Sequence, residues 1–547
     1  MPLYGLMQDR PLLISSLIEH AARFHPEVEI VSRLPEGGTR RTNWAGIRRD
    51  ACRIAHALKQ LGVGEGERVG TLAWNSDRHL SMYFGVSGAG SVLHTVNPRL
   101  FPEQIEYIVN HAEDQVLFFD ITFAPLVEKL APKLRTVRSY VAMTSREHMP
   151  RIDVPQLLCW DELLDAQPDT FSWPEFDERL ASSLCYTSGT TGHPKGVLYS
   201  HRSTVLHSLM ELAPDTFGLN SAETVMLIVP MFHANAWGTP YAAAMVGTRL
   251  VLPGPHLDGQ SVYELMAQEK VTFSQGVPTV WLMLFQYLDA HPELDPKALG
   301  LRRVGIGGAA VSRAMLERFE QQFGAEVVQG WGMTETSPIG VVSKLLPRHQ
   351  GLDAEALAQV KLKQGRGVWG VDLKLVDDAG EVQPWDGTSR GHLRVRGPWI
   401  ASGYFKGEGG SPIDEEGFFS TGDVATIDAD GYLQLVDRAK DVIKSGGEWI
   451  SSIDVENAAM GHPAVAEAAI IGVAHPKWQE RPLLIVVPRA GQVVDRASIL
   501  DFLATRVAKW WLPDDVVFVN ELPHTATGKL LKTKLREQYR NHVLPDA

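Results

Sequence analysis

The segment YTSGTTGHPKGV, residues 186–197, places four serines and threonines, three glycines and a lysine within twelve positions. It follows the strand-like apolar run Ser183–Cys185 and is followed by the apolar-rich run Val197–Tyr199. Glycine permits backbone conformations in which N–H groups converge, and such groups, together with hydroxyls and a lysine, can surround a polyphosphate. The segment therefore predicts a loop that holds a triphosphate.

Two alternatives apply to this segment. A Walker A loop would need serine or threonine after the lysine, but Lys195 lies between Pro194 and Gly196. A Gly/Ser/Thr-rich run can also be a surface linker. A linker is rarely flanked by strand-like and apolar runs, so the phosphate loop is the preferred interpretation. The predicted phosphate-binding residues are Thr187, Ser188, Gly189, Thr190, Thr191, Gly192 and Lys195.

The same segment resembles the signature loop of the AMP-forming acyl-CoA synthetase superfamily, which also contains adenylation domains and beetle luciferases. The resemblance extends over essentially the whole chain, and QGWGMTETSP at residues 329–338 is its second strong signature. It is closest to bacterial medium- and long-chain fatty-acid–CoA ligases and to their sister group that activates 3-methylthiopropionate. The features SGGEWIS (445–451), His233 and Trp237 are common to these subgroups, so they leave the chain length of the acid open.

Composition limits the class of protein. A chain of 547 residues exceeds a single hydrophobic core, so at least two domains are expected. The formal net charge of −13 argues against nucleic acid as the main partner. Three distant cysteines suggest neither a disulfide framework nor a zinc site, which fits a reducing compartment. The N-terminus lacks signal-peptide features and no run of 18 apolar residues occurs, so a soluble cytoplasmic enzyme without an integral membrane segment is expected.

The order of predicted elements indicates the fold class. Strands alternate with helices from Pro11 to Gln329, which is typical of mostly parallel sheets covered on both faces. After about Gly367, short alternating segments favour a small antiparallel β-barrel. We therefore expect an α/β protein: a large N-terminal domain (1–436) of doubly wound, mostly parallel sheets plus a small β-barrel, a hinge (437–441), and a smaller mobile α+β C-terminal domain (442–547).

Residues 230–238 follow the apolar strand Val225–Val229, and loops at the carboxyl ends of parallel strands bind ligands in open α/β sheets. His233 and Trp237 could equally be packed structural residues. The resemblance implies that they line an acyl pocket, with the aromatic ring gating the entry of the acyl tail. Amino-acid-activating relatives carry an acidic residue where this chain has His233, which argues against an amino-acid substrate.

Two further turns are expected to border the acyl group and the nucleotide. The small residues Gly307, Gly308 and Ala309 leave a slot after a strand, although glycines also serve tight packing. By the resemblance, this turn borders both ligands, and Gly332 adds to the acyl pocket. Ala309 stands where many relatives have serine, a departure that reshapes the pocket.

The second signature supplies groups for the nucleotide. Trp331 between two glycines can stack on a purine, and the Thr334 hydroxyl can contact a phosphate oxygen. Glu335 provides a hard oxygen ligand for Mg²⁺, with Thr190 as a second expected ligand, although a lone glutamate is usually a solvated surface charge. The remaining ATP- or AMP-binding residues implied by the resemblance are Gly308, Ala309, Gln329, Gly330, Gly332, Asp423, Arg438 and Lys529.

The resemblance also assigns roles to the C-terminal part. Asp423 and Arg438 are implied to hold the ribose, and Lys440 lies where the hinge is expected. Lys529 corresponds to the lysine that enters the site for adenylation and is a possible target of regulatory acetylation. The loop expected to meet the pantetheine arm of CoA carries Lys444, Gly446, Gly447 and Trp449.

Together these features predict a two-step ligase that uses ATP, Mg²⁺ and CoA. A carboxylate attacks the α-phosphorus to form acyl-AMP and pyrophosphate, and a thiol then displaces AMP. The expected catalytic residues are Lys529, His233, Thr334 and Glu335. The favoured substrate is a medium- or long-chain fatty acid, with 3-methylthiopropionate as the alternative. A luciferase-like oxygenase and a carrier-loading adenylation enzyme are less favoured, as is a non-enzymatic binding protein, and a homodimer is possible.

Overall fold

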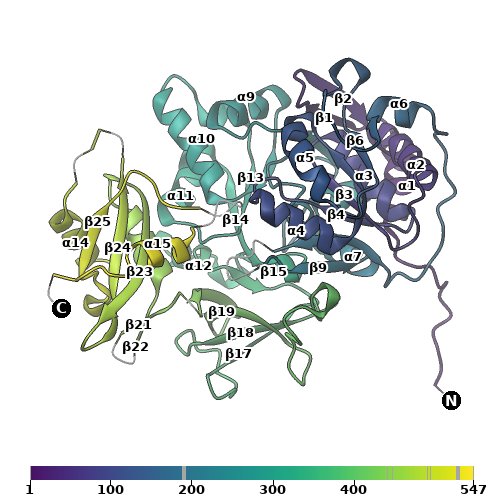
Figure 1. The fold of residues 1–547 in the computed structure, drawn as a ribbon. Coiled ribbons are helices and arrows are strands. Elements are labelled where there is room, and N and C mark those ends of the chain that lie inside the picture. The colour runs from purple at the N-terminus through teal and green to yellow at the C-terminus, as the bar shows by residue number, and fades with distance from the viewer. Residues whose placement is uncertain are drawn as a thin grey trace.

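The computed structural model describes residues 2–187, 193–439, 441–445, 448–489, 491–492, 494–524 and 530–545, with Glu448 and Trp449 described by backbone only. In Figure 1 the C-terminal part of the chain forms a yellow-green unit beside the large remainder of the chain. Three sheets organise the described residues, two in the large part and one in the C-terminal unit. This arrangement confirms the predicted fold class, a large domain of mostly parallel sheets with a smaller α+β unit.

The first sheet has seven strands in the order β7-β6-β5-β3-β4-β8-β9. All its pairs are parallel except β8 with β9, which are antiparallel and frame the phosphate segment. Its strands are β3 (Arg68–Leu72), β4 (Val92–Thr95), β5 (Asp114–Phe119), β6 (Ser139–Ala142), β7 (Leu157–Cys159), β8 (Ala181–Tyr186) and β9 (Gly196–Ser200).

The second sheet is a thirteen-stranded path, β17-β18-β19-β20-β16-β15-β14-β13-β12-β10-β11-β1-β2. The pairs from β14 to β1 are parallel, whereas those from β14 to β17 are antiparallel, so the late strands predicted as a β-barrel continue from the parallel half. Its strands are β1 (Glu29–Arg33), β2 (Thr39–Asn43), β10 (Thr224–Leu227), β11 (Arg249–Leu252), β12 (Phe273–Gly276), β13 (Arg303–Ile306), β14 (Glu326–Gly332), β15 (Ile339–Val342), β16 (Gly365–Gly367), β17 (Asp372–Val376), β18 (Gly391–Arg396), β19 (Phe419–Ile427) and β20 (Tyr432–Arg438).

The C-terminal sheet is built around the long antiparallel pair of β23 and β24. β21 and β25 also pair with β24, at different positions along it, and β22 pairs with β21. Its strands are β21 (Ile443–Ser445), β22 (Glu448–Ile450), β23 (Val465–His475), β24 (Gln479–Pro488) and β25 (Asp515–Phe518). Apolar clusters lie on its two faces, one including Ile470 and Leu484 and the other Ile471 and Leu483.

The helices pack against these sheets through apolar faces. In α1, for example, Ile14, Leu17, Ile18 and Ala21 recur at helical spacing and are all buried. The helices are α1 (Ile14–Phe24), α2 (Trp44–Gln60), α3 (Asp77–Gly88), α4 (Pro102–Ala112), α5 (Ala124–Leu130), α6 (Trp160–Asp165), α7 (His201–Leu212), α8 (Thr239–Val246), α9 (Gly259–Glu269), α10 (Pro278–Ala290), α11 (Arg313–Arg318), α12 (Ala354–Lys361), α13 (Ser452–Met460), α14 (Arg496–Ala504) and α15 (Lys532–Gln538).

The helix after β13 changes its pitch along its length. It is α-helical from Arg313 to Arg318 and continues as a wider π-type turn, Phe319–Phe323. Phe319 and Phe323 both pack against Phe285 of α10, with ring centroids 5.0 and 5.9 Å away. Packing of the two rings against one neighbour accompanies the change of helical pitch.

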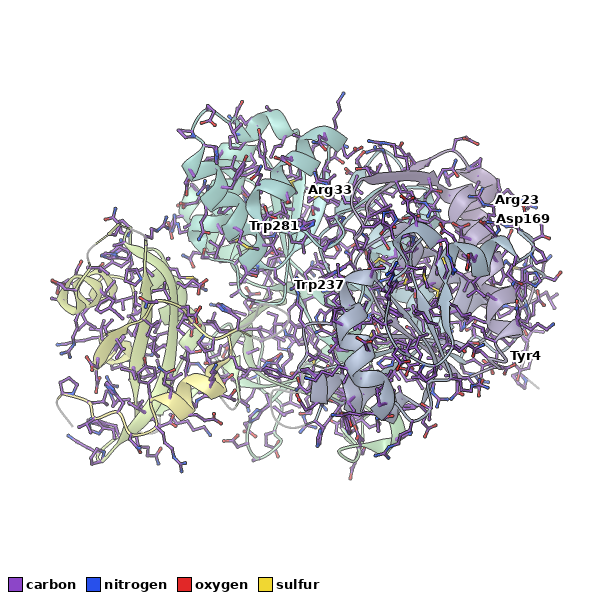
Figure 2. All side chains as sticks on the ribbon, turned by 45° about the horizontal axis from the view of Figure 1, so that its top comes forward. Tyr4, Arg23, Arg33, Asp169, Trp237 and Trp281 are labelled. Atoms are coloured by element: carbon purple, nitrogen blue, oxygen red, sulfur yellow. The ribbon has the colours of Figure 1, made fainter. Side chains whose placement is uncertain are left out.

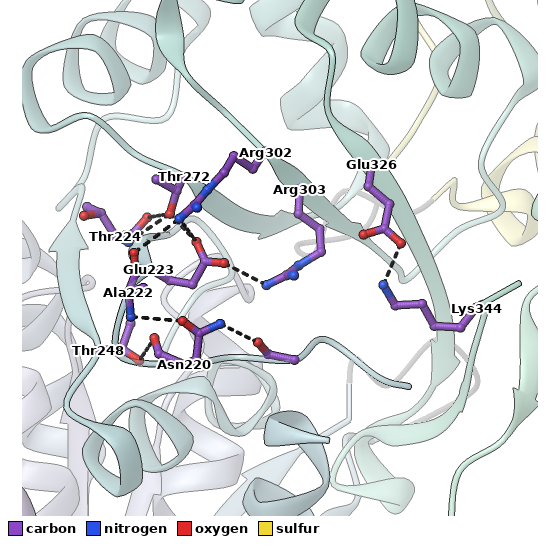
Figure 3. A network of polar contacts seen from close by, with 11 residues as sticks. Asn220, Ala222, Glu223, Thr224, Thr248, Thr272, Arg302, Arg303, Glu326 and Lys344 are labelled. Carbon is purple, nitrogen blue, oxygen red and sulfur yellow. Dashed lines mark hydrogen bonds and ion pairs between the residues drawn. The ribbon is translucent and has the colours of Figure 1, made fainter. Parts of the chain in front are cut away.

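A charge network fixes the amino ends of the central parallel strands (Figure 3). Glu223, just before β10, accepts hydrogen bonds from Arg302 and Arg303 at the start of β13, at 3.2 and 3.1 Å. Thr272, before β12, also donates to Glu223. The network therefore lies at the amino ends of these strands. Ligand sites in such sheets form at the opposite edge, at the carboxyl ends.

Candidate functional site

A cavity of about 1090 Å³ opens where the carboxyl ends of β8, β10, β13 and β14 meet the C-terminal unit. Its lining brings together segments that are more than 300 residues apart in the sequence. The sequence-predicted residues that line it are Thr187, Lys195, His233, Trp237, Gly307, Gly308, Ala309, Gly330, Trp331, Gly332, Thr334, Glu335, Asp423 and Arg438.

The two ends of the phosphate segment are held together. Thr187 donates its N–H to the carbonyl of Lys195 at 2.9 Å, and the Lys195 N–H donates to the Thr187 hydroxyl at 3.1 Å. The Lys195 ammonium lies 4.7 Å from the centroid of the Tyr404 ring, and no described carboxylate forms an ion pair with it. Lys195 is thus a cation inside the cavity that a phosphate can engage; residues 188–192 lie outside the described residues.

Asp423 and Arg438 meet across the antiparallel pair of β19 and β20. The Asp423 carboxylate lies 2.8 Å from the Arg438 guanidinium and accepts a 2.9 Å hydrogen bond from the indole N–H of Trp331. Asp423 is only 2% exposed as a whole residue, but it lines the cavity. The three side chains form one hydrogen-bonded group in the lining of the cavity.

Gln329 is the predicted nucleotide residue that the structure keeps away from the cavity lining. Its amide oxygen accepts the N–H of Val311 at 2.8 Å, and its amide nitrogen donates to the carbonyls of Leu362 and Lys363, both at 2.9 Å. The fully used side chain anchors the turn after Gly308 instead. Gln329 therefore lies outside the cavity lining and supports the turn that follows Gly308.

Glu335 presents a buried carboxylate to the cavity. Its Oε1 accepts a 2.7 Å hydrogen bond from the Tyr404 hydroxyl, and burial together with Glu335 raises the pKa of Tyr404, so the phenol stays a donor. Thr334 is fixed through its carbonyl, which accepts the Tyr199 hydroxyl at 2.6 Å. The described residues contain no cluster of three metal-binding side chains. One carboxylate fits Mg²⁺, which takes most of its ligands from phosphates and water.

The apolar part of the cavity surrounds Trp237, which lies near the centre of the molecule in Figure 2. Val229, Val277 and Ala234 pack with it. A Cβ at Gly307 would lie 3.0 Å from the Trp237 ring, so the glycine permits this close packing. Phe232 and His233 line the same region, which makes this part of the cavity suited to an apolar chain.

Several cavity residues were not singled out in the sequence. Arg99 follows β4, the sheet neighbour of β8, and lies with its guanidinium 5.9 Å from the centroid of the Phe232 ring. Desolvation lowers the pKa of Arg99 although the residue is exposed to solvent, and no described carboxylate forms an ion pair with it. The rule that ligands bind at carboxyl ends of parallel strands could have marked it.

A second unpredicted group adjoins the phosphate segment. Tyr107 of α4 donates to Glu408 at 2.7 Å and stacks on His193, with ring centroids 4.4 Å apart. His111, one turn further along α4, lies 3.4 Å from the same carboxylate. Tyr107 and Glu408 are 301 positions apart in the sequence, so no sequence pattern indicates their contact.

The C-terminal unit contributes one wall of the cavity. His524 and Leu530, which flank the segment containing Lys529, both line it. Lys532 and Glu456 do so as well, with the ammonium 2.8 Å from the carboxylate. Lys529, Lys440, Gly446 and Gly447 lie outside the described residues.

Lys444, the predicted CoA residue whose side chain is described, does not line the cavity. Lys444 belongs to β21 and pairs by backbone with Trp449 of β22.

All three cysteines are free and buried. No helix in the described ranges has the length and apolar composition needed to cross a bilayer.

Two family models match most of the chain. Residues 18–405 match the model of the AMP-binding enzyme family, and residues 454–529 match that of the AMP-binding enzyme C-terminal domain. The chain is 52% identical over 538 residues to a 3-methylmercaptopropionyl-CoA ligase of Ruegeria pomeroyi, covering 98% of this chain and 99% of that one.

Two further relatives cover nearly the whole chain. A medium-chain-fatty-acid–CoA ligase of Ectopseudomonas oleovorans is 47% identical, over 99% of this chain and 98% of its own. The crystal structure of an anthranilate CoA ligase in complex with anthranoyl-AMP superposes with a TM-score of 0.85 at 27% identity, covering 98% of each chain.

Proposed function

The chain belongs to the AMP-binding enzyme family, and from this premise we propose that it joins an apolar carboxylic acid to CoA at the cavity described above. It is an acid–thiol ligase of the AMP-forming type, for which ATP and CoA are co-substrates. The observation that supports the site assignment is the single cavity in which an apolar wall around Trp237 adjoins the polar group around Asp423.

We propose a fatty acid of medium or long chain as the substrate. The apolar wall formed by Trp237, Val229 and Val277 suits an alkyl chain. A second candidate is 3-methylthiopropionate, supported by two Ruegeria relatives with that activity in their names, at 52% and 50% identity. Both acids are apolar beyond the carboxylate, so the same wall suits either.

The first half-reaction needs two anions to meet. We propose that Lys195 and the phosphate segment hold the β- and γ-phosphates and that Asp423 and Arg438 hold the ribose. Glu335 would hold Mg²⁺, which neutralises phosphate charge when bound. Lys529 would lie between the carboxylate and the α-phosphate, so that a carboxylate oxygen attacks phosphorus and pyrophosphate leaves.

The second half-reaction needs other groups at the same place. The CoA thiol attacks the acyl carbon and AMP leaves. We propose that residues 437–441 are the hinge about which the C-terminal unit turns, so that the segment from Lys444 to Trp449 replaces the one containing Lys529. His524 and Leu530 line the cavity in the present conformation, which supports the assignment of this conformation to adenylation.

We also propose a cytoplasmic location, which the three free cysteines support.

ATP–pyrophosphate exchange, measured with carboxylic acids of increasing length and then repeated as product formation with CoA, tests this function. We expect exchange that depends on the acid and a thioester that forms only when CoA is added. Exchange restricted to 3-methylthiopropionate would favour the second candidate. Absence of exchange with every acid would contradict the proposed function.

A further inference from the structure

The acyl pocket is carried by an unusual stretch of backbone. Four consecutive L-residues, Ala234, Asn235, Ala236 and Trp237, have positive φ angles of 41°, 52°, 51° and 58°. Left-handed conformations are unfavourable for residues with a Cβ and normally occur one at a time. A run of four persists only where surrounding contacts hold it, so the groups that fix this turn also fix the position of the Trp237 ring.

Asn235 supplies the side-chain contacts within the turn. Its amide nitrogen donates to the Ser183 hydroxyl at 2.8 Å, and its amide oxygen accepts from the Cys185 thiol at 3.3 Å. All three side chains are buried, and asparagine tolerates the left-handed region better than most residues. Both partners lie on β8, the strand that leads into the phosphate segment. The amide therefore ties the acyl turn to that strand.

The contact continues beyond β8. Cys185 packs against Tyr199 of β9, and the Tyr199 hydroxyl donates to the carbonyl of Thr334 at 2.6 Å. Asn235, Cys185, Tyr199 and Thr334 thus connect the acyl turn, the strands that frame the phosphate segment, and the segment carrying Glu335. Buried polar networks with satisfied partners hold their members rigidly in place.

We propose that Asn235 is a positioning residue that sets the acyl selectivity of the pocket. Its amide fixes the left-handed turn to strand β8, and this turn carries Trp237. The inference rests on the proposed function for the identity of the ligand. Asn235 itself is absent from the cavity lining, whereas Trp237 is part of it. Loss of the amide is expected to alter the fit of the acyl chain and to leave the nucleotide contacts intact.

The informative variant is Asn235→Gly, because glycine keeps the left-handed backbone while removing both hydrogen bonds. Ser183→Ala removes one partner without touching the turn and covers the case in which Asn235→Gly does not fold. Ser274→Ala is the matched control: it is a buried serine on β12, its hydroxyl donates to the Met226 carbonyl at 2.7 Å, and it is absent from the cavity lining.

Binding is measured by calorimetry with two acyl-sulfamoyl adenosines, carrying 3-methylthiopropionyl and octanoyl groups, and with AMP alone. We expect Asn235→Gly to change the ratio of the two dissociation constants by about tenfold, the effect of one or two hydrogen bonds, with Ser183→Ala changing it in the same direction. The dissociation constant of AMP in Asn235→Gly, and all three dissociation constants in the Ser274→Ala control, should stay near the wild-type values.

An unchanged ratio in both variants would overturn the proposal. Equal weakening of both analogues and of AMP would also overturn it, because that pattern indicates a general structural role. These binding constants remain readable if the wild-type enzyme fails the exchange assay, so failure of the proposed function is distinguished from failure of this inference.

Discussion

At the scale of single residues, the contact between Glu335 and Tyr404 connects two segments that the sequence keeps 69 positions apart. Tyr404 also lies beneath the Lys195 ammonium. One phenol ring thus orients the carboxylate assigned to Mg²⁺ and contacts the cation assigned to the phosphates. Its hydroxyl is the part that can be removed without losing the ring.

Tyr404→Phe is expected to raise the KM for MgATP by about tenfold, because Glu335 loses a hydrogen bond to a charged group worth roughly 1.5–3 kcal/mol. The KM for the acid should change little. Steady-state kinetics with varied MgATP checks this, with Tyr263→Phe as a control, since Tyr263 packs on Tyr287 and is absent from the cavity lining. An unchanged KM for MgATP would show that the hydroxyl does not orient the metal-binding carboxylate.

Sequence reasoning identified Glu335 and Lys195 because each lies in a short segment of characteristic composition. It missed Tyr404, Tyr107 and Glu408 because these residues reach the site through contacts between distant segments. It assigned Gln329 to the nucleotide, although the amide is used to support a neighbouring turn. Local patterns predict which segments form the site, whereas side-chain direction depends on tertiary packing.

At the scale of secondary-structure elements, a buried charge cluster joins α13 and α15 to the expected hinge. Lys532 of α15 lies 2.8 Å from Glu456 of α13, and Arg536 lies 2.6 Å from Asp441. Burial alone would lower the pKa of Lys532, but the attraction of Glu456 and Asp437 outweighs it, and the pKa is raised. The largely buried Lys532–Glu456 pair and the partly exposed Arg536–Asp441 pair thus connect α13, α15 and the expected hinge.

Lys532→Met is expected to lower the stability of the C-terminal unit by about 3–5 kcal/mol, because removing one partner leaves buried carboxylates without a counter-charge. Thermal unfolding followed by calorimetry measures the loss. Lys534→Met is the matched control, since this lysine is exposed on the same helix. A double variant with Glu456→Leu should recover part of the stability, and equal melting of the two single lysine variants would refute the role of the cluster.

The type of most elements could be predicted from periodicity, but their partners could not. The alternation of strands and helices indicated parallel sheets, which the structure confirms. The left-handed turn at Asn235 and the continuation of β14 into antiparallel strands had no local signal. Both depend on neighbours that are distant in the sequence, such as β8 for the turn.

At the scale of the whole molecule, the cavity lies between the large domain and the C-terminal unit, and both contribute to its walls. A cleft shared by two units allows the groups around one bound intermediate to be exchanged by rotation. The large domain supplies the apolar wall and is proposed to supply the nucleotide contacts. The C-terminal unit is expected to supply one lysine for adenylation and a different segment for thioester formation. A homodimer remains a prediction.

The most direct test of this account is Lys529→Ala assayed in each half-reaction separately. We predict that acid-dependent ATP–pyrophosphate exchange is lost, because no cation remains to bring carboxylate and α-phosphate together. Thioester formation from supplied acyl-adenylate and CoA should remain close to wild type. Equal loss of both half-reactions, or exchange that persists without the lysine, would contradict the account.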